Sequence, residues 1–143
     1  MKHLTFITII IGMALNASLS AQDLSEHRWK DRLLLVYTSD RDSEMFRKQF
    51  DAWMNDREGL EERKLELYSV TPSLVRRGWS NGKWEERDDS LDTFLSEKGD
   101  FEVVLLGLDG NVKLRQEKLL DSEKLYRTID AMPMRQNELR NNE

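Results

Sequence analysis

The chain contains no cysteine, and this absence excludes several classes of function. Disulfide exchange and peroxide reduction by a thiol both need a thiolate as the nucleophile. Zinc and copper cages need imidazole or thiolate ligands, and the sequence has two histidines, His3 and His27. We therefore expect neither a thiol oxidoreductase nor a peroxidase, and we expect no metal, no cofactor and no recognisable catalytic residue.

Long apolar runs are also scarce, because the sequence has only one, at its start. Met1-Lys2-His3 is a short basic start, residues 4–15 are mostly apolar, and residues 16–21 are small or polar. This layout is typical of a secretory signal peptide, and the run is too short to span a bilayer. We expect cleavage after Ala21 or, alternatively, after Ser20. The other alternative is a buried N-terminal helix.

Export and cleavage would leave residues 22–143 as one soluble domain in the periplasm or outside the cell. This part carries no transmembrane pattern, and no cysteine is present for lipid attachment. Its length suits a single domain. Basic residues are outnumbered, with 22 Lys and Arg against 27 Asp and Glu. Removal of Lys2 makes the balance more acidic still, which argues against nucleic-acid binding.

Apolar spacing predicts a strand, a helix and a second strand in the first half of the domain. Residues 33–37 form a continuous apolar run, as in a strand buried on both faces. Residues 64–70 alternate polar and apolar, as in a second strand. The helix between them should end near Gly59, with its N-cap at Asp40 or Asp42 and its apolar face formed by Phe46, Phe50, Trp53 and Met54.

The second half predicts a short helix, a hairpin and a last helix. Residues 71–90 are irregular, and a helix from Asp89 or Ser90 to Gly99 should follow. Residues 101–108 and 112–115 read as strands joined by a tight Asp109-Gly110 turn. The last helix should begin at Asp121 or Ser122, bury Leu125, Ile129 and Met132, and end at Pro133, leaving a polar tail that frays.

The resulting order is β-α-β-α-β-β-α. The first crossover requires a parallel pair of strands, and the Asp-Gly turn requires an antiparallel pair. A mixed four-stranded sheet with helices on both faces satisfies both conditions. We therefore expect a thioredoxin-like, three-layer α/β/α fold, with residues 22–143 as a single domain.

Several segments also resemble a known family. These are Trp29, Arg32-Leu33-Leu34-Leu35, Gln49, Glu62-Arg63-Lys64-Leu65, GLDGNVKLR (107–115) and IDAMPMRQNE (129–138). Together they resemble the bacterial family known as domain of unknown function 4174, which is similar to a thioredoxin-like domain of secreted sushi-repeat and matrix proteins. The resemblance covers essentially the whole mature chain. It implies a thioredoxin-like fold in an exported protein, and it implies no established reaction.

The turn at residues 38–43 lies where thioredoxins and peroxiredoxins carry their reactive cysteine. Here Ser39, Asp40, Asp42 and Ser43 occupy that place. An anion could bind at the start of the following helix, but the carboxylates already present would repel it. The simpler interpretation is that this turn caps a helix.

The segment RRGWSNGKWE (76–85) is the candidate binding site. Asn81-Gly82 favours a type I′ turn, which would place Trp79 and Trp84 opposite each other. With Arg76, Arg77 and Lys83 these indoles form a basic and aromatic patch on an acidic protein. It could recognise a protein, an acidic peptide or a glycan. The alternative is a hairpin that only stabilises itself against the edge of the domain.

The sequence thus predicts an exported, cysteine-free thioredoxin-like domain with a non-catalytic binding or structural role. Its expected partners are proteins, peptides or glycans, with no nucleic acid. The alternative is a hydrolase-type periplasmic enzyme that uses carboxylates at the strand ends, because the chain has many carboxylates but no recognisable nucleophile and base pair.

Overall fold

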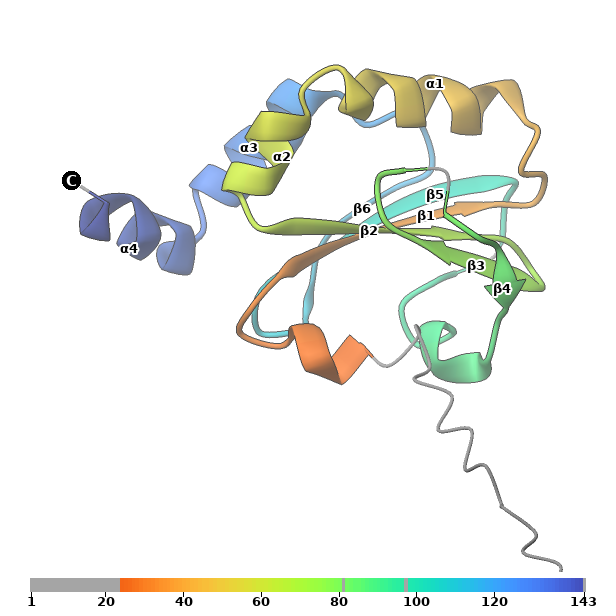
Figure 1. Cartoon of the computed structure of the whole chain (residues 1–143), viewed down its shortest axis with the longest axis horizontal. Helices are drawn as coiled ribbons and strands as arrows, with labels where there is room; N and C mark the ends of the chain where they lie inside the picture. Colours follow the sequence, from red (N-terminus) through yellow and green to blue (C-terminus); the bar gives the residue numbers. More distant parts are fainter. Residues whose placement is uncertain (1–23, 81, 97, 143) are drawn as a thin grey trace, which may run out of the picture.

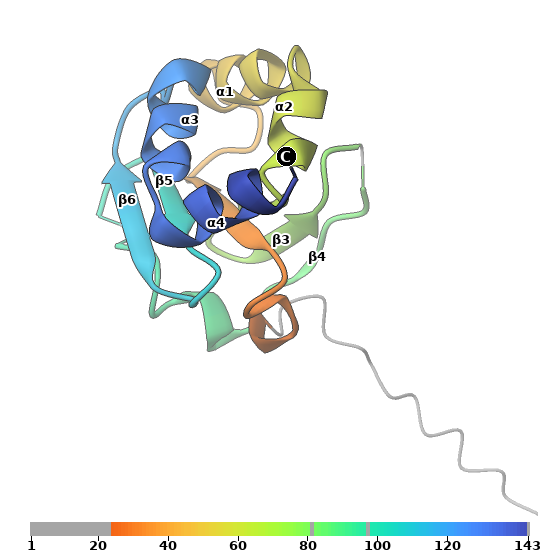
Figure 2. The ribbon, with the colours of Figure 1, turned by 90° about the vertical axis from the view of Figure 1, so that its left-hand side faces the viewer.

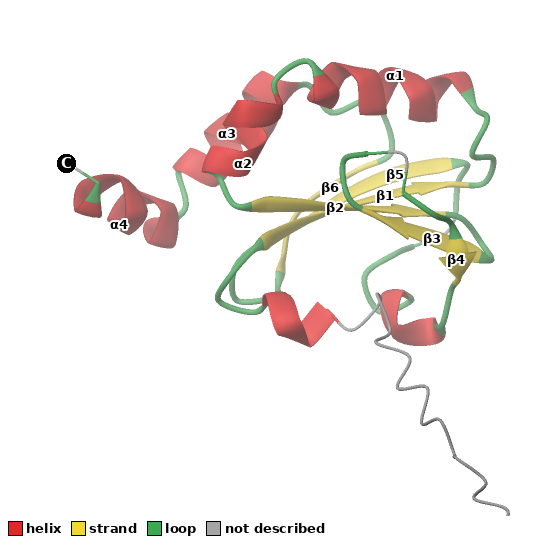
Figure 3. Cartoon of the chain, in the orientation of Figure 1, coloured by secondary structure: helices red, strands yellow, loops and turns green. Residues whose placement is uncertain are grey.

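The computed structural model describes residues 24–80, 82–96 and 98–142. The predicted signal peptide, residues 1–21, lies outside the described residues. The described part contains a six-stranded mixed sheet in the order β4-β3-β2-β1-β5-β6. Helices α1, α2 and α3 cover one face of this sheet, and short turns and loops cover the other (Figures 1 and 3). No helix in the described ranges is long and apolar enough to cross a membrane.

The first β-α-β unit matches the prediction. β1 (Arg32–Thr38) is buried along its whole length and pairs in parallel with β2 (Leu65–Val70), with Leu34 opposite Leu67. β1 lies in the middle of the sheet, so both of its faces are covered, and this explains its continuous apolar run. Its carboxyl end leads directly into the turn before the first helix.

The predicted hairpin is also present. β5 (Phe101–Leu106) runs antiparallel to β1 on one side and to β6 (Val112–Gln116) on the other. In the connecting turn, the Gly110 N–H donates to the Gly107 carbonyl at 3.0 Å. Gly110 has a φ of +79°, a conformation that suits glycine. The four strands β2-β1-β5-β6 are therefore the predicted four-stranded sheet.

Two further strands correct the prediction of four. β3 (Leu74–Arg77) pairs antiparallel with β2, and the two-residue β4 (Glu85–Glu86) pairs with β3. They lie inside residues 71–90, which were expected to be irregular. Only Val75 of this pair of strands is fully buried, so the segment is too short and too exposed to show an alternating pattern.

The helical layer differs from the prediction at its ends. α1 (Glu44–Met54) is capped by Ser43, whose hydroxyl accepts from the Phe46 N–H at 3.2 Å, so neither Asp40 nor Asp42 is the N-cap. The chain then begins a separate helix, α2 (Arg57–Glu62), which Asp56 caps. The single helix expected to reach Gly59 is therefore two. α3 (Ser122–Asp130) begins at the Asp121 cap, as predicted.

The opposite face has no α-helix. The helix expected from Asp89 or Ser90 to Gly99 is only a 3-10 turn, η2 (Asp89–Leu91), followed by loop. Leu91 and Leu95 are nevertheless buried against this face of the sheet, with Phe94 partly buried beside them. A second 3-10 turn, η1 (Leu24–His27), covers the rest of it. In the described residues the expected three layers thus have α-helices on one side of the sheet and two short 3-10 helices on the other.

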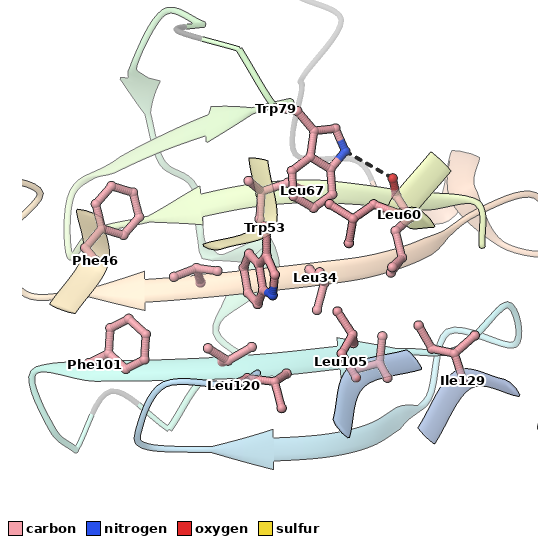
Figure 4. Packing of buried hydrophobic residues seen from close by; sticks show 14 residues of the cluster. Leu34, Phe46, Trp53, Leu60, Leu67, Trp79, Phe101, Leu105, Leu120 and Ile129 are labelled. Atoms are coloured by element: carbon pink, nitrogen blue, oxygen red, sulfur yellow. Dashed lines mark hydrogen bonds between the residues drawn. The ribbon is translucent and has the colours of Figure 1, made fainter. Parts of the chain in front are cut away.

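The main core lies between the sheet and helices α1–α3 (Figure 4). Phe46 and Trp53 point from α1 to strands β1 and β2, and Leu125 and Ile129 complete the core from α3. Gln49 is buried among these side chains and exchanges two hydrogen bonds with the Leu120 backbone, at 2.9 and 2.7 Å. These bonds fix the loop between β6 and α3 to the middle of α1.

The polar tail is not frayed. Residues 133–141 form α4 (Pro133–Asn141), with Pro133 in its first turn. This helix lies at the end of the sheet where β1 begins, beside the end of α3 (Figure 2). Arg135 is the buried residue of α4. Ion pairs attach this helix to the domain, and the helix has no apolar face. The sequence therefore shows no amphipathic pattern here.

Candidate functional site

The indole of Trp79 belongs to the core. Trp79 is only 6% exposed, packs edge-to-face on Trp53 with ring centroids 6.3 Å apart, and donates its Nε1–H to the Leu65 carbonyl at 3.2 Å. Figure 4 shows this bond and the position of the ring above β2. A buried indole with its N–H satisfied stabilises the fold and offers little surface to a ligand.

Trp84 takes a different partner. Its ring lies 6.4 Å from that of Phe46, and the Arg76 guanidinium lies 4.8 Å from its centroid. The pairing of Val75 with Glu85 would, if continued, place Arg76 opposite Trp84. The predicted cross-strand pair of Trp79 and Trp84 is therefore wrong, because the strands are paired in another register. The predicted turn at Asn81-Gly82 falls partly on Asn81, outside the described residues.

The three basic residues of this segment, Arg76, Arg77 and Lys83, do not form one patch. Arg76 is half-buried over Phe46 and Phe50, and burial lowers its pKa. Arg77 forms an ion pair with Glu26 at 2.6 Å and lies over Tyr68, whereas Lys83 is exposed. The structure thus brings Arg76 and Trp84 together and places Arg77, Trp79 and Lys83 in three different surroundings. Recognition by this segment remains a prediction.

The turn at the carboxyl end of β1 satisfies its own polar groups. The Thr38 hydroxyl donates to the Asp40 carbonyl at 2.7 Å, and the Asp42 N–H donates to the Asp40 carboxylate at 2.9 Å. The Ser39 hydroxyl donates to Asp100 at 2.9 Å. A cavity of about 250 Å³ lies beside this turn, and Ser39, Ser43, Asp100 and Glu117 contribute its polar lining. We call it the tip pocket.

A larger cavity, of about 460 Å³, lies at the opposite end of β1. Four separate segments form its lining: Arg32 at the start of β1, residues 107–109 and Lys113 of the β5–β6 hairpin, Thr128 of α3, and residues 131–134 where α3 turns into α4. We call it the elbow pocket. Its volume is within the range of small-molecule sites.

The hairpin wall of the elbow pocket carries a fixed ion pair. The Lys113 ammonium lies 2.8 Å from the Asp109 carboxylate, which also accepts from the N–H and the side-chain amide of Asn111, at 3.1 and 3.0 Å. The hydrogen bonds from Lys113 and Asn111 lower the pKa of Asp109 to about 2. The carboxylate is therefore charged at any physiological pH, and its oxygens are occupied.

Ion pairs of the buried Arg135 attach α4 behind this pocket. Arg135, 2% exposed, contacts Glu62 at 2.6 Å, Asp130 at 3.2 Å and Glu138 at 3.3 Å. Arg63 contacts Asp130 at 2.8 Å. With Arg32 and Lys64, which pair with Glu138, these residues form what we call the elbow network. It joins β1, the end of α2, α3 and α4.

Two carboxylates of the elbow network, Asp130 and Glu138, have lowered pKa values. Burial raises the pKa of Asp130, but hydrogen bonds from Arg63 and Arg135 outweigh this effect and leave it lowered. Burial likewise raises the pKa of Glu138, and its contacts with Arg32, Lys64 and Arg135 outweigh that effect. Both shifts favour the charged form of these two carboxylates.

Arg32 connects the elbow network to the pocket. Its side chain is fully buried, and its two terminal nitrogens donate to Glu138 at 3.3 and 3.2 Å. One of these nitrogens also donates to the Arg63 carbonyl at 3.0 Å. The Arg32 Nε is buried and has no hydrogen-bond partner, although Arg32 lines the pocket. A buried donor without a partner costs about 1–3 kcal/mol, so this nitrogen is a local cost to the fold.

The buried His27 side chain connects two elements of the fold. Its Nδ1 lies 2.7 Å from the Asp31 carboxylate, and its Nε2 lies 2.8 Å from the Tyr68 hydroxyl. Burial raises the pKa of Tyr68 to about 12, so the phenol stays protonated. Both ring nitrogens are occupied, and His27 tethers η1 to β2. The ring also lines a second cavity of about 250 Å³ under the sheet.

The sequence matches the profile of a family described as Domain of unknown function (DUF4174), over residues 23–138. This match spans most of the chain. The chain belongs to the DUF4174 family. No curated protein matches it.

Among solved structures, the chain is similar to the reduced 2-Cys peroxiredoxin of Plasmodium vivax, with a TM-score of 0.55 and 16% identity. The likeness covers 80% of this chain and 83% of the peroxiredoxin. At this identity the comparison concerns the fold alone, which is thioredoxin-like. This DUF4174 domain has no cysteine, so no thiol chemistry follows from it.

The sequence reasoning missed the elbow pocket and its network. The available signal was the density of arginines and carboxylates in the segments that carry the family resemblance, Arg32, 62–65 and 129–138. These segments meet at one end of the sheet. Nothing local in the sequence reveals this, because Arg32 and Glu138 are 106 positions apart.

Proposed function

We propose that this chain is an exported domain that binds a small ligand in its elbow pocket and performs no catalysis. The observation that supports this proposal is the pocket itself. It is about 460 Å³ in volume and is lined by four segments that are separate in the sequence. The buried ion pairs of Arg32 and Arg135 fix its walls in advance, and preorganised walls lower the entropic cost of binding. The absence of cysteine at the tip of the fold also supports a function without thiol chemistry.

Stabilisation by ligands tests this binding function. A library of small organic molecules is screened by thermal unfolding of the full chain, because a ligand at 100 times its Kd stabilises a protein by about 2.7 kcal/mol. Ala131→Phe adds a ring at the pocket wall, and Ala52→Phe adds the same ring on exposed α1 as a control. Ligands that stabilise wild type and Ala52→Phe but not Ala131→Phe support the proposal. Equal stabilisation of both variants contradicts it.

Export rests on the pattern of residues 1–21, with its basic start, apolar run and small-residue exit. The intact mass of the protein recovered outside the cytoplasm tests it. Cleavage between Ala21 and Gln22 is the expected result, and a retained Met1 or a lipid adduct contradicts it.

The alternative of a carboxylate-dependent hydrolase is favoured by one observation, the tip pocket with its two serines and two carboxylates. The Ser43 hydroxyl is used as the helix cap, and Ser39 donates to Asp100. Asp100→Asn separates the two functions: it abolishes hydrolysis of ester or glycoside substrates if the alternative is correct, and it leaves ligand binding in the elbow pocket unchanged.

A further inference from the structure

The walls of the elbow pocket combine an apolar surface with positive charge. Leu108, Ala131, Met132 and Pro133 line it, and Met134, which is 39% exposed, lies at the first turn of α4. Methionine side chains are flexible and polarizable, so such walls adapt to apolar groups of different shape. The apolar part of the lining therefore suits a hydrocarbon body and does not specify its outline.

The charged part of the lining consists of two cations, Arg32 and Lys113, and one anion, Asp109. Asp109 already accepts from Lys113 and from both donors of Asn111, which occupies its oxygens. Lys113 has a side chain that is 34% exposed, so its ammonium can accept a further anionic partner. Asp109 is therefore a positioning group for Lys113 and a poor partner for a ligand.

The elbow network behind the pocket carries an excess of positive charge. Glu138 is shared by three cations, Arg32, Lys64 and Arg135. The network as a whole has one more cation than it has carboxylates, the cations being Arg32, Arg63, Lys64 and Arg135 and the carboxylates Glu62, Asp130 and Glu138. The complete chain has a net charge of −5, so this local excess runs against its overall charge. Charge complementarity favours an anion.

We infer that the elbow pocket binds an amphipathic organic carboxylate, with its hydrocarbon body against the methionines and its carboxylate at the Lys113 ammonium. This inference rests on the proposed binding function and adds the class of ligand. Lys113 contributes an ammonium at the rim, and the buried guanidinium of Arg32 adds positive charge behind the lining. Charge-assisted hydrogen bonds to a carboxylate are about twice as strong as neutral ones, so the head group decides specificity.

Three probes of equal chain length test the class of ligand by calorimetric titration of the full chain. Decanoate is the anion, decanol the neutral control and decyltrimethylammonium the cation. We expect decanoate to bind at least tenfold more tightly than decanol, which is about 1.4 kcal/mol, and the cation to bind more weakly than both. Equal affinities for decanoate and decanol overturn the inference.

Two variants change the head-group site in opposite directions. Lys113→Gln should reduce decanoate affinity to that of decanol, and Asp109→Asn should increase decanoate affinity, because it leaves the ammonium of Lys113 without its internal partner. The matched control Lys118→Gln, an exposed lysine outside the elbow pocket, should change neither. A loss of affinity in Lys118→Gln equal to that in Lys113→Gln overturns the inference.

The failure of this inference is distinguishable from the failure of the proposed function. If decanol binds as well as decanoate and Ala131→Phe removes both, the pocket binds ligands but does not select carboxylates. If Ala131→Phe leaves decanoate affinity at the wild-type value, or if no probe binds at 1 mM, the inferred site is wrong. Ligands from the library that require Ala131 then decide the proposed function separately.

Discussion

Glu138→Gln should destabilise the domain strongly, although Glu138 lies in a C-terminal segment that the sequence predicts to be a frayed polar tail. Glu138 accepts two hydrogen bonds from Arg32, whose side chain is fully buried, and one from Arg135. The substitution keeps the size of the side chain and removes its charge. The buried guanidinium of Arg32 is then left with the Arg63 carbonyl as its remaining acceptor, apart from the new amide.

The magnitude follows from the burial of the pair. Loss of one partner of a buried ion pair costs about 3–5 kcal/mol. The Glu138 side chain is 15% exposed, and the glutamine oxygen can keep one neutral hydrogen bond worth about 1 kcal/mol, so we expect a loss of about 2–3 kcal/mol. For a domain of this size the melting temperature should fall by about 8–12 °C.

Thermal and urea unfolding of the full chain measure this loss. Glu123→Gln is the matched control, because Glu123 pairs with Arg127 at 3.4 Å on the surface of α3 and both side chains are mostly exposed. We expect the control to change the free energy of unfolding by less than about 0.5 kcal/mol. The double variant Arg32→Met with Glu138→Leu should recover most of the loss, since apolar replacements of a buried pair are often neutral. Equal effects of Glu138→Gln and Glu123→Gln would refute the role of the elbow network.

Three further predictions concern pH, the tryptophans and the hairpin turn. The pKa values of Asp130 and Glu138 are lowered in the folded state, so their contribution to stability is complete above their unfolded values of 3.8 and 4.5 and is lost as the pH falls below them. Unfolding at pH 3 to 6 should show this loss, and it should be smaller in Glu138→Gln; identical pH profiles would exclude Glu138 as a source. The indole exciton signal in far-UV circular dichroism should come from Trp53 and Trp79, so Trp79→Phe should remove it and Trp84→Phe should keep it; the reverse result would restore the pairing of Trp79 with Trp84. Gly110→Ala should cost about 1 kcal/mol or more in urea unfolding because of the positive φ, whereas Gly99→Ala, with no atom near its added Cβ, should cost less; an equal cost for both would show that the backbone of Gly110 is not constrained.

The central part of the fold was predictable from local pattern. β1 and β5 are buried strands with runs of apolar residues, and β2 shows an alternation of polar and apolar residues; the sequence shows both patterns directly. The Asp109-Gly110 turn was predictable because glycine fits the positive φ that the turn requires. These features need no information about distant residues.

The remaining part depends on contacts between distant residues. α4 buries only Arg135, so no apolar stripe marks it, and the carboxylates that hold it come from α2, α3 and α4 itself. β3 is stabilised by pairing with β2, and β4 by pairing with β3, more than by their own pattern. The two tryptophans were misplaced for the same reason, since the indole of Trp79 finds its partners on α1 and β2.

The elbow pocket was not predictable from the sequence, because its lining combines four segments that meet only in the folded chain. The local sequence pattern instead favours the segment from Arg76 to Trp84, which has the clearest local chemistry. In the structure most of that chemistry is used inside the fold, with Trp79 buried and Arg76 stacked on aromatic rings.

Amide chemical-shift mapping during titration with decanoate tests most directly whether the elbow pocket is the ligand site. We predict that the largest shifts occur in two groups, residues 107–113 and residues 128–134, both of which contain residues of the pocket lining. They should disappear in Ala131→Phe and persist in Ala52→Phe. Shifts centred on residues 38–43 or on residues 76–84 would contradict this assignment. They would place the function at the tip pocket or at the segment from Arg76 to Trp84.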